Sequence, residues 1–431
     1  MTTEAETMVR RATLHSRYPE LGNGPVPIEP YVSSEFYERE KEHVFKKSWI
    51  HVGRVEELPE AGRFFVKDLP SLDTSVIVSR AKDGTIHAMH NVCAHRMNRM
   101  ACAGHGKARR FTCKFHGWSY DLGGNLVGVP DEHLFMNFDK RDHGLSKIHV
   151  DIWQGFIFIN VAAEPAQSLQ DFMGPMYGAL DGYPFDRLTN CYSWQAVVKC
   201  NWKLALDAFQ EAYHVAYVHG NSIANAMWRD EGGSVRPLDG LCGEHHRRLS
   251  MGGNVNSVYG NPKAATDTGT DATGAIGGVK HSHPIAAAAL KLGKGGAKFE
   301  VSPQDLPTGL NWTKHPDWAF DINMIFPDFY LSLRPNYYQA YNFRPLTHNT
   351  FLFDARVYYP EMVTAGGRFY QEYMKVALRD VLLEDMSTLE DTQQASETGI
   401  KTHMVLQDYE LMVRHQYEVV TRMIAQGEQT A

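Results

Sequence analysis

Residues 93–126 read CAHRMNRMACAGHGKARRFTCKFHGWSYDLGGNL, and this stretch decides the fold of the first half of the chain. It holds two Cys/His pairs, Cys93-x-His95 and Cys113-x-x-His116, separated by 17 residues. Two thiolates and two imidazoles first suggest structural zinc. Zinc fingers, however, usually pair Cys with Cys and His with His along the chain, whereas each pair here offers one of each. The alternation favours a two-iron cluster in which one iron takes the thiolates and the other the imidazoles.

This mixed ligation is the Rieske arrangement of a [2Fe-2S] cluster. Replacing two thiolates by neutral imidazoles removes negative charge and raises the reduction potential, which suits an electron relay. We expect the histidines on the exposed iron, where electrons can pass to a partner surface. Scattered core thiols and surface histidines are the alternative, but the fourfold spacing followed by His116-Gly117-Trp118 argues against it. Cys102 has no role in the pattern and is expected to be a free thiol.

Short apolar runs, cut by turn signals, surround the two pairs from Trp49 to Asn160 and predict a small all-β unit. Before it, residues 28–45 predict a short amphipathic helix. After it, residues 165–230 are mostly helical in pattern, with one continuous helix over 202–218. Further elements are expected as strands at 322–326, 330–333, 337–344 and 350–359 and as helices over about 367–394 and 401–426. Residues 252–296 are rich in Gly, Ala and Thr, which predicts a flexible insertion or lid.

The composition bounds the class of protein. A chain of 431 residues has room for two or three domains, and 22% charged with 43% hydrophobic residues is ordinary globular composition. A net charge of -7 gives no basic field, so nucleic-acid binding is not expected. No signal-peptide core and no apolar run of membrane-spanning length is present, and six cysteines are too few for a disulfide scaffold. We therefore expect a cytoplasmic protein without a membrane span.

A second group of candidate ligands lies in NWKLALDAFQEAYHVAYVHG, residues 201–220. His214 and His219 are five positions apart, so on an unbroken helix they would point about 140° away from each other. They can share one metal only if the site lies at a helix end or bend. A mononuclear Fe(II) oxygenase needs two histidines and one carboxylate on one face of the metal, and the carboxylate can come from far away in sequence.

The motif Cys93-Ala-His95-Arg96 and the motif Cys113-Lys-Phe-His116-Gly-Trp-Ser-Tyr-Asp resemble the two cluster-binding loops of the Rieske non-haem iron oxygenases. The resemblance is to the catalytic alpha subunits of the aromatic-ring-hydroxylating dioxygenase superfamily. Gly124-Asn-Leu and Pro130 resemble the glycine turn and the proline-containing loop that follow in that family. Met97 departs from the pattern, because the family usually has Gly there. A side chain at this position could crowd the loop but should not affect ligation.

The resemblance implies an α+β fold with two domains and a leading arm. Residues 1–46 would form a helical arm that packs on the catalytic domain. Residues 47–162 would form the all-β Rieske domain. Residues 163–431 would form the catalytic domain, an antiparallel sheet covered by helices in a helix-grip, START-like arrangement, with 252–296 as its insertion.

The resemblance also implies the ligands of a mononuclear Fe(II). It makes His214 and His219 two of them and assigns the third to Asp385, from the pattern Glu384-Asp385 followed by Glu390 and Gln393. Glu384 is turned by roughly 100° around the same helix, so we expect its loss to matter much less. Asp380, Glu390 and Asp391 are the next candidates if neither residue is the ligand.

Glu211 is a second departure. Many aromatic-ring dioxygenases have Asp three residues before the first iron histidine, and that carboxylate bridges to a cluster histidine of the neighbouring subunit. Glu stands there in members that resemble monooxygenases of carnitine and other quaternary amines. The longer side chain still allows the bridge, so substrate class is what the change affects. Asp207, one turn earlier, could orient Glu211 or act as an outer acid near the site.

These features together predict an enzyme, the oxygenase component of a multicomponent Rieske oxygenase that uses O2 on a small organic substrate. No GxGxxG motif follows a strand, so a separate reductase or ferredoxin is expected to supply electrons. The resemblance implies a homotrimer, in some relatives with added beta subunits. Two rival classes are a non-catalytic Rieske electron carrier, which leaves the second ligand set unexplained, and a structural zinc protein.

The substrate is expected to bind between the iron-binding helix and the strands that carry Phe320, Ile325, Phe329, Tyr337 and Tyr341. Such aromatic side chains could hold an aromatic ring or form a cage for a quaternary ammonium. The apolar stretch 286–292 and the few acidic residues nearby favour a neutral or anionic hydrophobic, aromatic substrate that is hydroxylated or dihydroxylated. Hydroxylation or demethylation of a quaternary amine is the alternative.

Overall fold

The structure is a computed structural model that describes residues 14–102, 104–220, 222–223, 227, 235–253, 275–276, 279–280, 284–293, 295–299, 301 and 306–430. Most of the segment 252–296, which the sequence predicts as an insertion or lid, therefore lies outside the described residues. The chain divides into two compact units. We call Glu38–Phe172 the small unit and Met1–Tyr37 with Met173–Ala431 the large unit.

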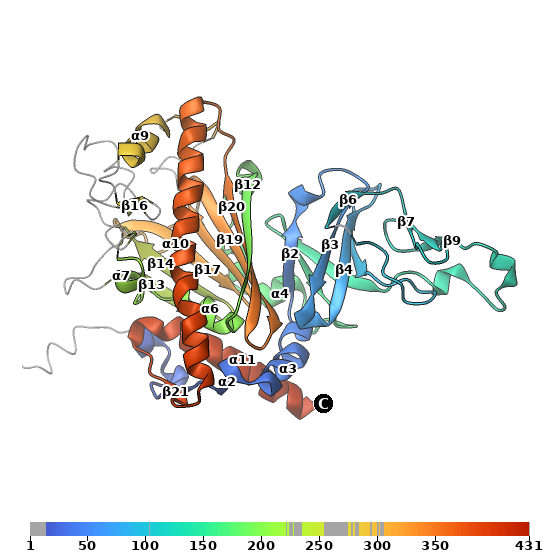
Figure 1. Ribbon diagram of the computed structural model, residues 1–431, viewed down its shortest axis with the longest axis horizontal. Helices are drawn as coiled ribbons and strands as arrows, with labels where there is room; N and C mark the ends of the chain where they lie inside the picture. Colours follow the sequence, from blue (N-terminus) through green and yellow to red (C-terminus); the bar gives the residue numbers. More distant parts are fainter. Residues whose placement is uncertain are drawn as a thin grey trace, which may run out of the picture. The chain divides into compact units, whose positions relative to one another are not determined.

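The small unit is built from two antiparallel sheets, as the sequence predicts (Figure 1). Seven strands pair in the order β2-β11-β10-β5-β4-β3-β6, and three more pair as β7-β8-β9. The strands are β2 Ile50–Arg54, β3 Arg63–Leu69, β4 Thr74–Arg80, β5 Ile86–His90, β6 His105–Lys107, β7 Phe111–Thr112, β8 Ser119–Tyr120, β9 Leu126–Gly128, β10 Lys147–Trp153 and β11 Phe156–Asn160. Two loops, between β5 and β6 and between β7 and β8, carry the two Cys/His pairs.

The large unit is a seven-stranded antiparallel sheet in the order β12-β20-β19-β18-β17-β14-β13. Its strands are β12 Asn190–Val198, β13 Pro237–Cys242, β14 Arg247–Gly252, β17 Trp318–Ile325, β18 Phe329–Arg334, β19 Tyr337–Thr347 and β20 Thr350–Tyr359. Two-residue strands form two further pairs, β1 Val26–Pro27 with β21 His403–Met404 and β15 Ala275–Ile276 with β16 Val279–Lys280.

The long helix α10 crosses one face of this sheet (Figure 1). Met374 and Leu378 of α10 pack against Val357 and Tyr359 of β20, so this face is the α10-facing side of the sheet. The helices are α2 Glu29–Val32, α3 Ser34–His43, α4 Leu169–Met173, α5 Met176–Ala179, α6 Trp202–Ala208, α7 Val215–Val218, α9 Pro284–Gly293, α10 Ala365–Glu397 and α11 Leu411–Thr430. Among the described residues, no helix is both long and apolar enough to cross a membrane. The fold is the predicted sheet covered by helices.

The prediction of one continuous helix over 202–218 is wrong. The chain leaves the helical path after Ala208 and starts the short helix α7 at Val215. The side chain of Glu211 explains the break, because its carboxylate accepts the backbone N–H groups of Tyr213 and His214, the latter at 3.2 Å. An acidic side chain that caps free N–H groups starts a new helical turn instead of continuing the old one.

Two other segments differ from the sequence pattern. Residues 190–198, expected within a helical region, form the edge strand β12, whose side chains are mostly exposed. An exposed edge strand lacks the apolar alternation by which strands are recognised. Residues 401–410, expected as the start of the last helix, instead hold the short strand β21 and a helical turn at Asp408–Glu410, and α11 begins at Leu411.

Candidate metal centres

The two cluster loops of the small unit have nearly the same backbone geometry. In the first, Met97 N–H donates to the carbonyl of Cys93 at 3.1 Å, and in the second Gly117 N–H donates to the carbonyl of Cys113 at 3.0 Å. The N–H of each cysteine is also bonded to the residue five positions on, Asn98 or Trp118. The chain thus uses one tight turn twice to present a cysteine and a histidine.

The backbone explains why Met97 is unusual. Met97 and Gly117 occupy equivalent positions, and both have positive φ, +56° and +74°. This left-handed conformation favours glycine because a Cβ atom crowds the following carbonyl. The Met97 side chain itself points to solvent and is 74% exposed, so it does not crowd the loop as the sequence suggested it could. Met at this position therefore destabilises the loop through its positive φ angle and not through a side-chain clash.

The four candidate cluster ligands divide into a buried and a more exposed pair. Cys93 and Cys113 are buried, whereas His95 and His116 are half-buried with ring centroids 4.6 Å apart. The Nδ1 atoms of both histidines are buried and have no hydrogen-bond partner. Buried ring nitrogens without partners cost free energy unless they bind something. Two thiols and two free imidazole nitrogens fit a two-iron cluster with its histidine iron nearer the surface.

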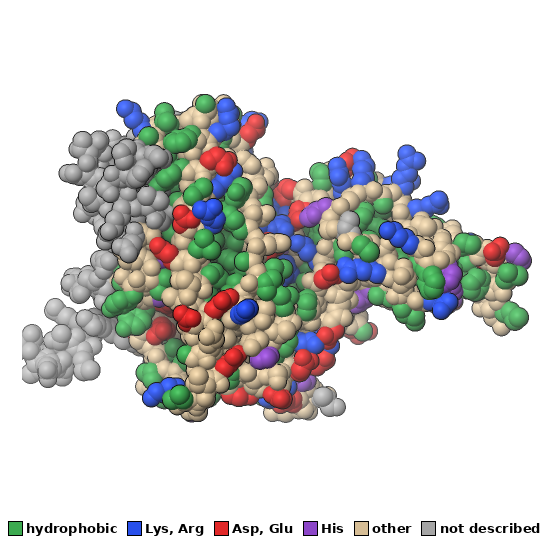
Figure 2. Space-filling view, viewed as in Figure 1, with side chains coloured by type: hydrophobic (Ala, Val, Ile, Leu, Met, Phe, Trp, Pro, Cys, Tyr) green, Lys and Arg blue, Asp and Glu red, His purple; other side chains and the backbone are tan. Residues whose placement is uncertain are grey.

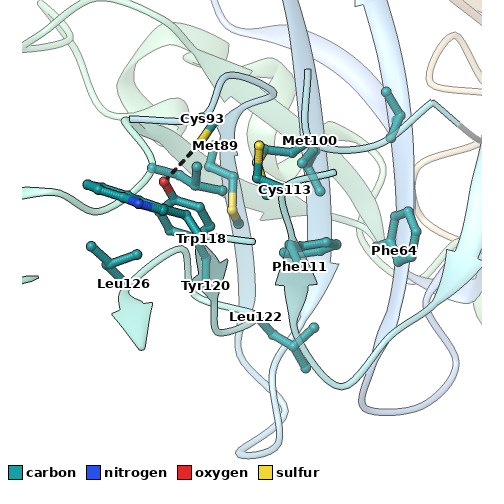
Figure 3. Packing of buried hydrophobic residues seen from close by; sticks show 13 residues of the cluster. Phe64, Met89, Cys93, Met100, Phe111, Cys113, Trp118, Tyr120, Leu122 and Leu126 are labelled. Carbon is teal, nitrogen blue, oxygen red and sulfur yellow. Dashed lines mark hydrogen bonds between the residues drawn. The ribbon is translucent and has the colours of Figure 1, made fainter. Parts of the chain in front are cut away.

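Aromatic side chains around the loops contact these ligands. The Trp118 ring stacks on His95, with the ring centroids 4.8 Å apart. The Tyr120 hydroxyl lies 3.3 Å from the sulfur of Cys93 (Figure 3). Burial works toward a higher pKa for the Cys113 thiol, but hydrogen bonds from the N–H of Phe115, from Cys93, from the N–H of His116 and from Asn98 together outweigh burial and lower that pKa. Hydrogen bonds to sulfur favour the thiolate, the form that binds iron.

The second candidate centre lies on the α10-facing side of the large unit. Each of His214, His219 and Asp385 offers one ligand atom, and these atoms all lie within 4.8 Å of one another. The Nε2 atoms of His214 and His219 are 3.6 Å and 3.0 Å from Oδ1 of Asp385. His214 precedes α7 and His219 follows it, so the two histidines meet at a short bend. The sequence required such a bend for a shared metal.

Hydrogen bonds on the far side of each ring fix the direction of both histidines. Nδ1 of His214 is bonded to Glu211, and Nδ1 of His219 lies 2.7 Å from the carboxylate of Glu384. Each Nε2 is therefore left to face the common point. Oδ1 of Asp385 is buried and has no well-aligned hydrogen bond, although Nε2 of His219 lies 3.0 Å from it. Two nitrogens and one orphaned carboxylate oxygen that converge in this way fit a 2-His-1-carboxylate iron site.

The acids around His219 affect its protonation. Burial lowers the pKa of His219, but Asp385 and Glu384 outweigh burial and raise it above its usual value. Without a metal, the imidazole therefore holds a proton more readily. Since iron needs the neutral ring, protons compete with the metal, and iron binding should weaken as the pH falls through the pKa of His219.

Glu384 has a larger place in the site than its helical register indicated. Its carboxylate accepts the Ser222 hydroxyl at 2.5 Å in addition to its bond with His219. Glu384 and Asp385 thus contact opposite sides of one imidazole, which their different directions around α10 allow. Spacing along one helix could not show this, because the shared partner comes from a distant segment.

The other acids of α10 lie elsewhere. Asp380 pairs with Arg379, and Glu390 accepts the N–H of Lys199 at 3.0 Å. Asp391 is exposed. Among the described residues, only Asp385 joins the two histidines in a group that could hold a metal.

We predict that Glu384→Ala lowers the affinity for mononuclear iron by about 10- to 100-fold, because the His219 ring loses the acceptor that orients it. The cluster spectrum should not change. Iron titration of the apoprotein measures the effect, with Asp380→Ala on the same helix as the control. Equal affinities in the two variants would show that Glu384 does not orient His219.

Asp207 lies in a buried polar network beside the site. Its Oδ1 accepts from Gln210 at 2.8 Å and Gln416 at 3.1 Å, and the Arg247 guanidinium donates to both glutamines. Among the described residues, Asp207 and Glu211 form no hydrogen bond with each other. The network joins the end of α6 to α11 and β14. This favours the interpretation of Asp207 as an acid outside the set of iron ligands over a role in orienting Glu211.

Burial raises the pKa of Asp207 to about 7, against the opposing effects of Tyr31, Gln210 and nearby cations. The unfolded chain gives up this proton near pH 4, so the cost of the buried charge grows from there to about pH 7. Asp207→Asn removes the cost and still accepts both amides. Its stability gain should therefore be larger at pH 8.5 than at pH 5.5 by about 2 kcal/mol.

Chemical denaturation at the two pH values measures this change. Asp391→Asn, on the exposed side of α10, is the control and should show no such pH dependence. A stability difference for Asp207→Asn that stays constant with pH would contradict the raised pKa.

The α10-facing side of the sheet carries part of the predicted substrate-binding set. Cross-strand register places Phe320, Tyr337 and Tyr341 on this side, together with Tyr330. Ile325 and Phe329 pair with each other on the opposite side, so these two residues of the predicted strands do not face α10. The period of two in a strand sends neighbouring residues to opposite faces, and the register of the strands was not known from sequence.

Both parts of the chain match known families. Residues 185–426 match the family described as ring hydroxylating alpha subunit (catalytic domain), and residues 48–139 match the Rieske [2Fe-2S] domain. The first match covers more than half of the chain.

Individual relatives differ in substrate. The chain is 36% identical over 193 residues to the biphenyl 2,3-dioxygenase subunit alpha of Rhodococcus jostii, covering 43% of this chain and 41% of the relative. It is 30% identical over 222 residues to the glycine betaine monooxygenase oxygenase subunit of Chromohalobacter salexigens, covering 52% and 49%. The chain spans about half the length of the curated relatives it matches.

A solved structure extends the likeness in fold over nearly the whole chain. It is a quaternary ammonium Rieske monooxygenase studied for carnitine oxidation, with a TM-score of 0.69, 19% sequence identity, and coverage of 94% of this chain and 95% of that one. At this identity the likeness concerns the fold alone.

Proposed function

Because the chain belongs to the ring-hydroxylating alpha subunit family and carries a Rieske [2Fe-2S] domain, we propose that it is the oxygenase component of a multicomponent Rieske oxygenase. Its substrate would be a hydrophobic, aromatic compound that is hydroxylated or dihydroxylated with O2. When bound, the cluster relays electrons and the mononuclear iron is the place where O2 is activated beside the substrate. The observation that carries the proposal is the presence of both ligand sets in one chain.

We assign Cys93, His95, Cys113 and His116 to the cluster and His214, His219 and Asp385 to the mononuclear iron. The convergent Nε2 atoms and the orphaned Oδ1 of Asp385 support the second set. A non-catalytic electron carrier would have no use for a buried carboxylate with two carboxylate-oriented histidines. A zinc protein would not need the two different sets.

An aromatic substrate is favoured over a quaternary amine by the charge on the α10-facing side. The Arg334 guanidinium lies 4.0 Å from the Phe320 ring centroid and 5.1 Å from that of Tyr337. A quaternary ammonium would compete with this cation for the same ring faces. Glu211, which occurs in quaternary-amine monooxygenases, favours the alternative of a carnitine- or betaine-like substrate, and this alternative is kept in the test below.

A neighbouring copy of the chain is the partner that we propose for the Glu211 side of the iron site. Tyr213 and Tyr217, next to the iron ligands, are exposed at 55% and 79%. On the small unit, Met97 and Phe115 are exposed beside the cluster ligands. Large apolar side chains exposed at both centres support contact between the small unit of one subunit and the large unit of the next, as in a homotrimer.

A separate reductase or ferredoxin is the second proposed partner. Figure 2 shows Lys and Arg side chains gathered on the small unit over β6 and β7, where Lys107, Arg109 and Arg110 are exposed. A positive surface near the cluster loops favours association with an acidic electron donor.

The proposed activity is tested by product analysis with a surrogate reductase and isotopically labelled O2. The substrates are aromatic acids, aromatic hydrocarbons, steroids and quaternary amines. We expect labelled oxygen in the products of aromatic substrates. Conversion of quaternary amines alone would support the alternative, and no labelled product from any class, in protein with both metals, would contradict an oxygenase.

A further inference from the structure

Gln339 is a buried polar side chain that the proposed machinery does not use. It lies in β19 and is only 3% exposed. Its Nε2 is buried, and no side chain or backbone group of the described residues accepts a hydrogen bond from it. A buried amide donor without a partner destabilises the fold, so it is expected where a ligand supplies the acceptor.

The register of the sheet places Gln339 on the α10-facing side. It pairs with Ser332 of β18 on one side and with Val357 of β20 on the other. Val357 packs against Met374 and Leu378 of α10. Directly paired residues of an antiparallel sheet point to the same face, so Gln339 points toward the helix that carries Asp385.

The position of Gln339 relative to the iron ligands can be followed along β19 and along α10. Tyr341, two residues away and about 7 Å along the strand, contacts Phe209, which follows α6, at 6.0 Å between ring centroids. On the helix, Leu378 is seven residues before Asp385, about 10 Å along the axis. Gln339 therefore lies directly opposite Ser332, between Tyr341 and Tyr337, and Tyr337 is the cross-strand partner of Arg334.

The chemistry of this region favours an anionic acceptor. Arg334 donates to Ser332 Oγ at 2.8 Å, and Ser332 pairs directly with Gln339. A guanidinium two positions from Ser332 on the same face makes the region favourable to negative charge. The neighbouring side chains are otherwise apolar or aromatic, which suits a planar ring.

We propose that Gln339 is a specificity-determining residue that donates a hydrogen bond to the carboxylate of an aromatic acid, with the ring held between the sheet and α10. This inference rests on the proposed oxygenase function and names its substrate class. A purely apolar arene would leave the amide unpaired, and a site built to bind a polar group discriminates against the analogue that lacks it. A quaternary ammonium group offers no acceptor for this donor.

The test measures binding without turnover. Benzoate, ethylbenzene and glycine betaine are titrated calorimetrically into the anaerobic, iron-loaded full chain. We expect benzoate to bind at least about 10-fold more tightly than ethylbenzene, as one charged hydrogen bond implies. Gln339→Leu should weaken benzoate binding at least about 10-fold, leave ethylbenzene binding unchanged or tighter, and not lower the melting temperature.

Gln371→Leu is the matched control. Gln371 is also a buried glutamine with an unpartnered Nε2, but it lies 14 residues before Asp385 on α10, about 21 Å along the axis. Its loss should leave benzoate affinity unchanged. The proposal is overturned if Gln339→Leu affects both aromatic ligands equally or neither, or if glycine betaine binds best. These outcomes are distinguishable from failure of the oxygenase function, which would appear as missing mononuclear iron or unlabelled products.

Discussion

Replacing Asp385 by alanine is expected to remove the mononuclear iron and to abolish product formation while the cluster spectrum stays unchanged. Among the residues that the structure describes, Asp385 is the one whose carboxylate oxygen faces both Nε2 atoms. Loss of one of three ligands should weaken iron binding by well over the 10- to 100-fold that is typical of an outer contact. Iron analysis should fall from about three to about two irons per chain, with sulfide unchanged.

Asp380→Ala is the control for Asp385→Ala, since Asp380 is on the same helix and pairs with Arg379. It should keep full iron and full activity. If Asp385→Ala kept its mononuclear iron, the third ligand would have to come from another residue. If Glu384→Ala lost the iron and Asp385→Ala did not, the ligand would be Glu384.

Glu211→Gln is expected to keep both metals and the fold but to lower steady-state turnover by more than about 100-fold. The amide oxygen can still accept from Nδ1 of His214, so the ring should keep its direction, while the backbone N–H groups of Tyr213 and His214 lose their carboxylate acceptor at a local cost. The amide cannot carry the charge of a carboxylate that links His214 to a cluster histidine of a neighbouring subunit. Coupling between the centres should therefore fail while each centre remains intact.

Reoxidation of the reduced cluster by O2 in the presence of substrate distinguishes a loss of electron transfer between the centres from damage to either centre. This step should slow in Glu211→Gln, whereas reduction of the cluster by the donor should not. Glu211→Asp, which keeps the charge on a shorter side chain, should restore part of the rate. Normal turnover in Glu211→Gln, or loss of the cluster itself, would count against the bridge.

The sequence indicates the metal chemistry well because ligand types and spacings are local. The alternation of Cys and His in the two pairs suffices to favour a two-iron cluster over zinc. The five-residue spacing of His214 and His219 requires a bend, and the structure has that bend. Asp385 is different: it lies 166 residues after His219 in the sequence, and only the family pattern identifies it.

The contacts that orient the ligands could not be read from the sequence. Glu384 and Ser222 meet at His219 from separate segments, and no spacing rule joins them. The break after α6 was missed because Glu211 is a good helix former by propensity, and its capping of the next N–H groups depends on the fold. The positive φ of Met97 was also hidden, since the residue type at that position argues against it.

The residues of the sheet that face α10 were the hardest to predict, because they depend on the register of the strands. The alternation of the strands is visible in the sequence, but which residues face α10 depends on cross-strand pairing, so the sequence alone does not show that Ile325 and Phe329 face away from α10. Gln339 gave no signal in the sequence, because a glutamine in a strand is usually a solvated residue. Its burial beside Val357 and Ser332 results from the cross-strand pairing of the sheet, which the sequence does not reveal.

Metal and sulfide analysis of the purified protein, combined with electron paramagnetic resonance, shows whether one chain holds two different iron centres. We expect about three irons and about two acid-labile sulfides per chain, a red-brown colour, the signal of a reduced Cys/His-ligated cluster, and a separate signal from the mononuclear iron with nitric oxide. Stoichiometric zinc without visible absorption, or two irons with no mononuclear signal, would contradict this expectation.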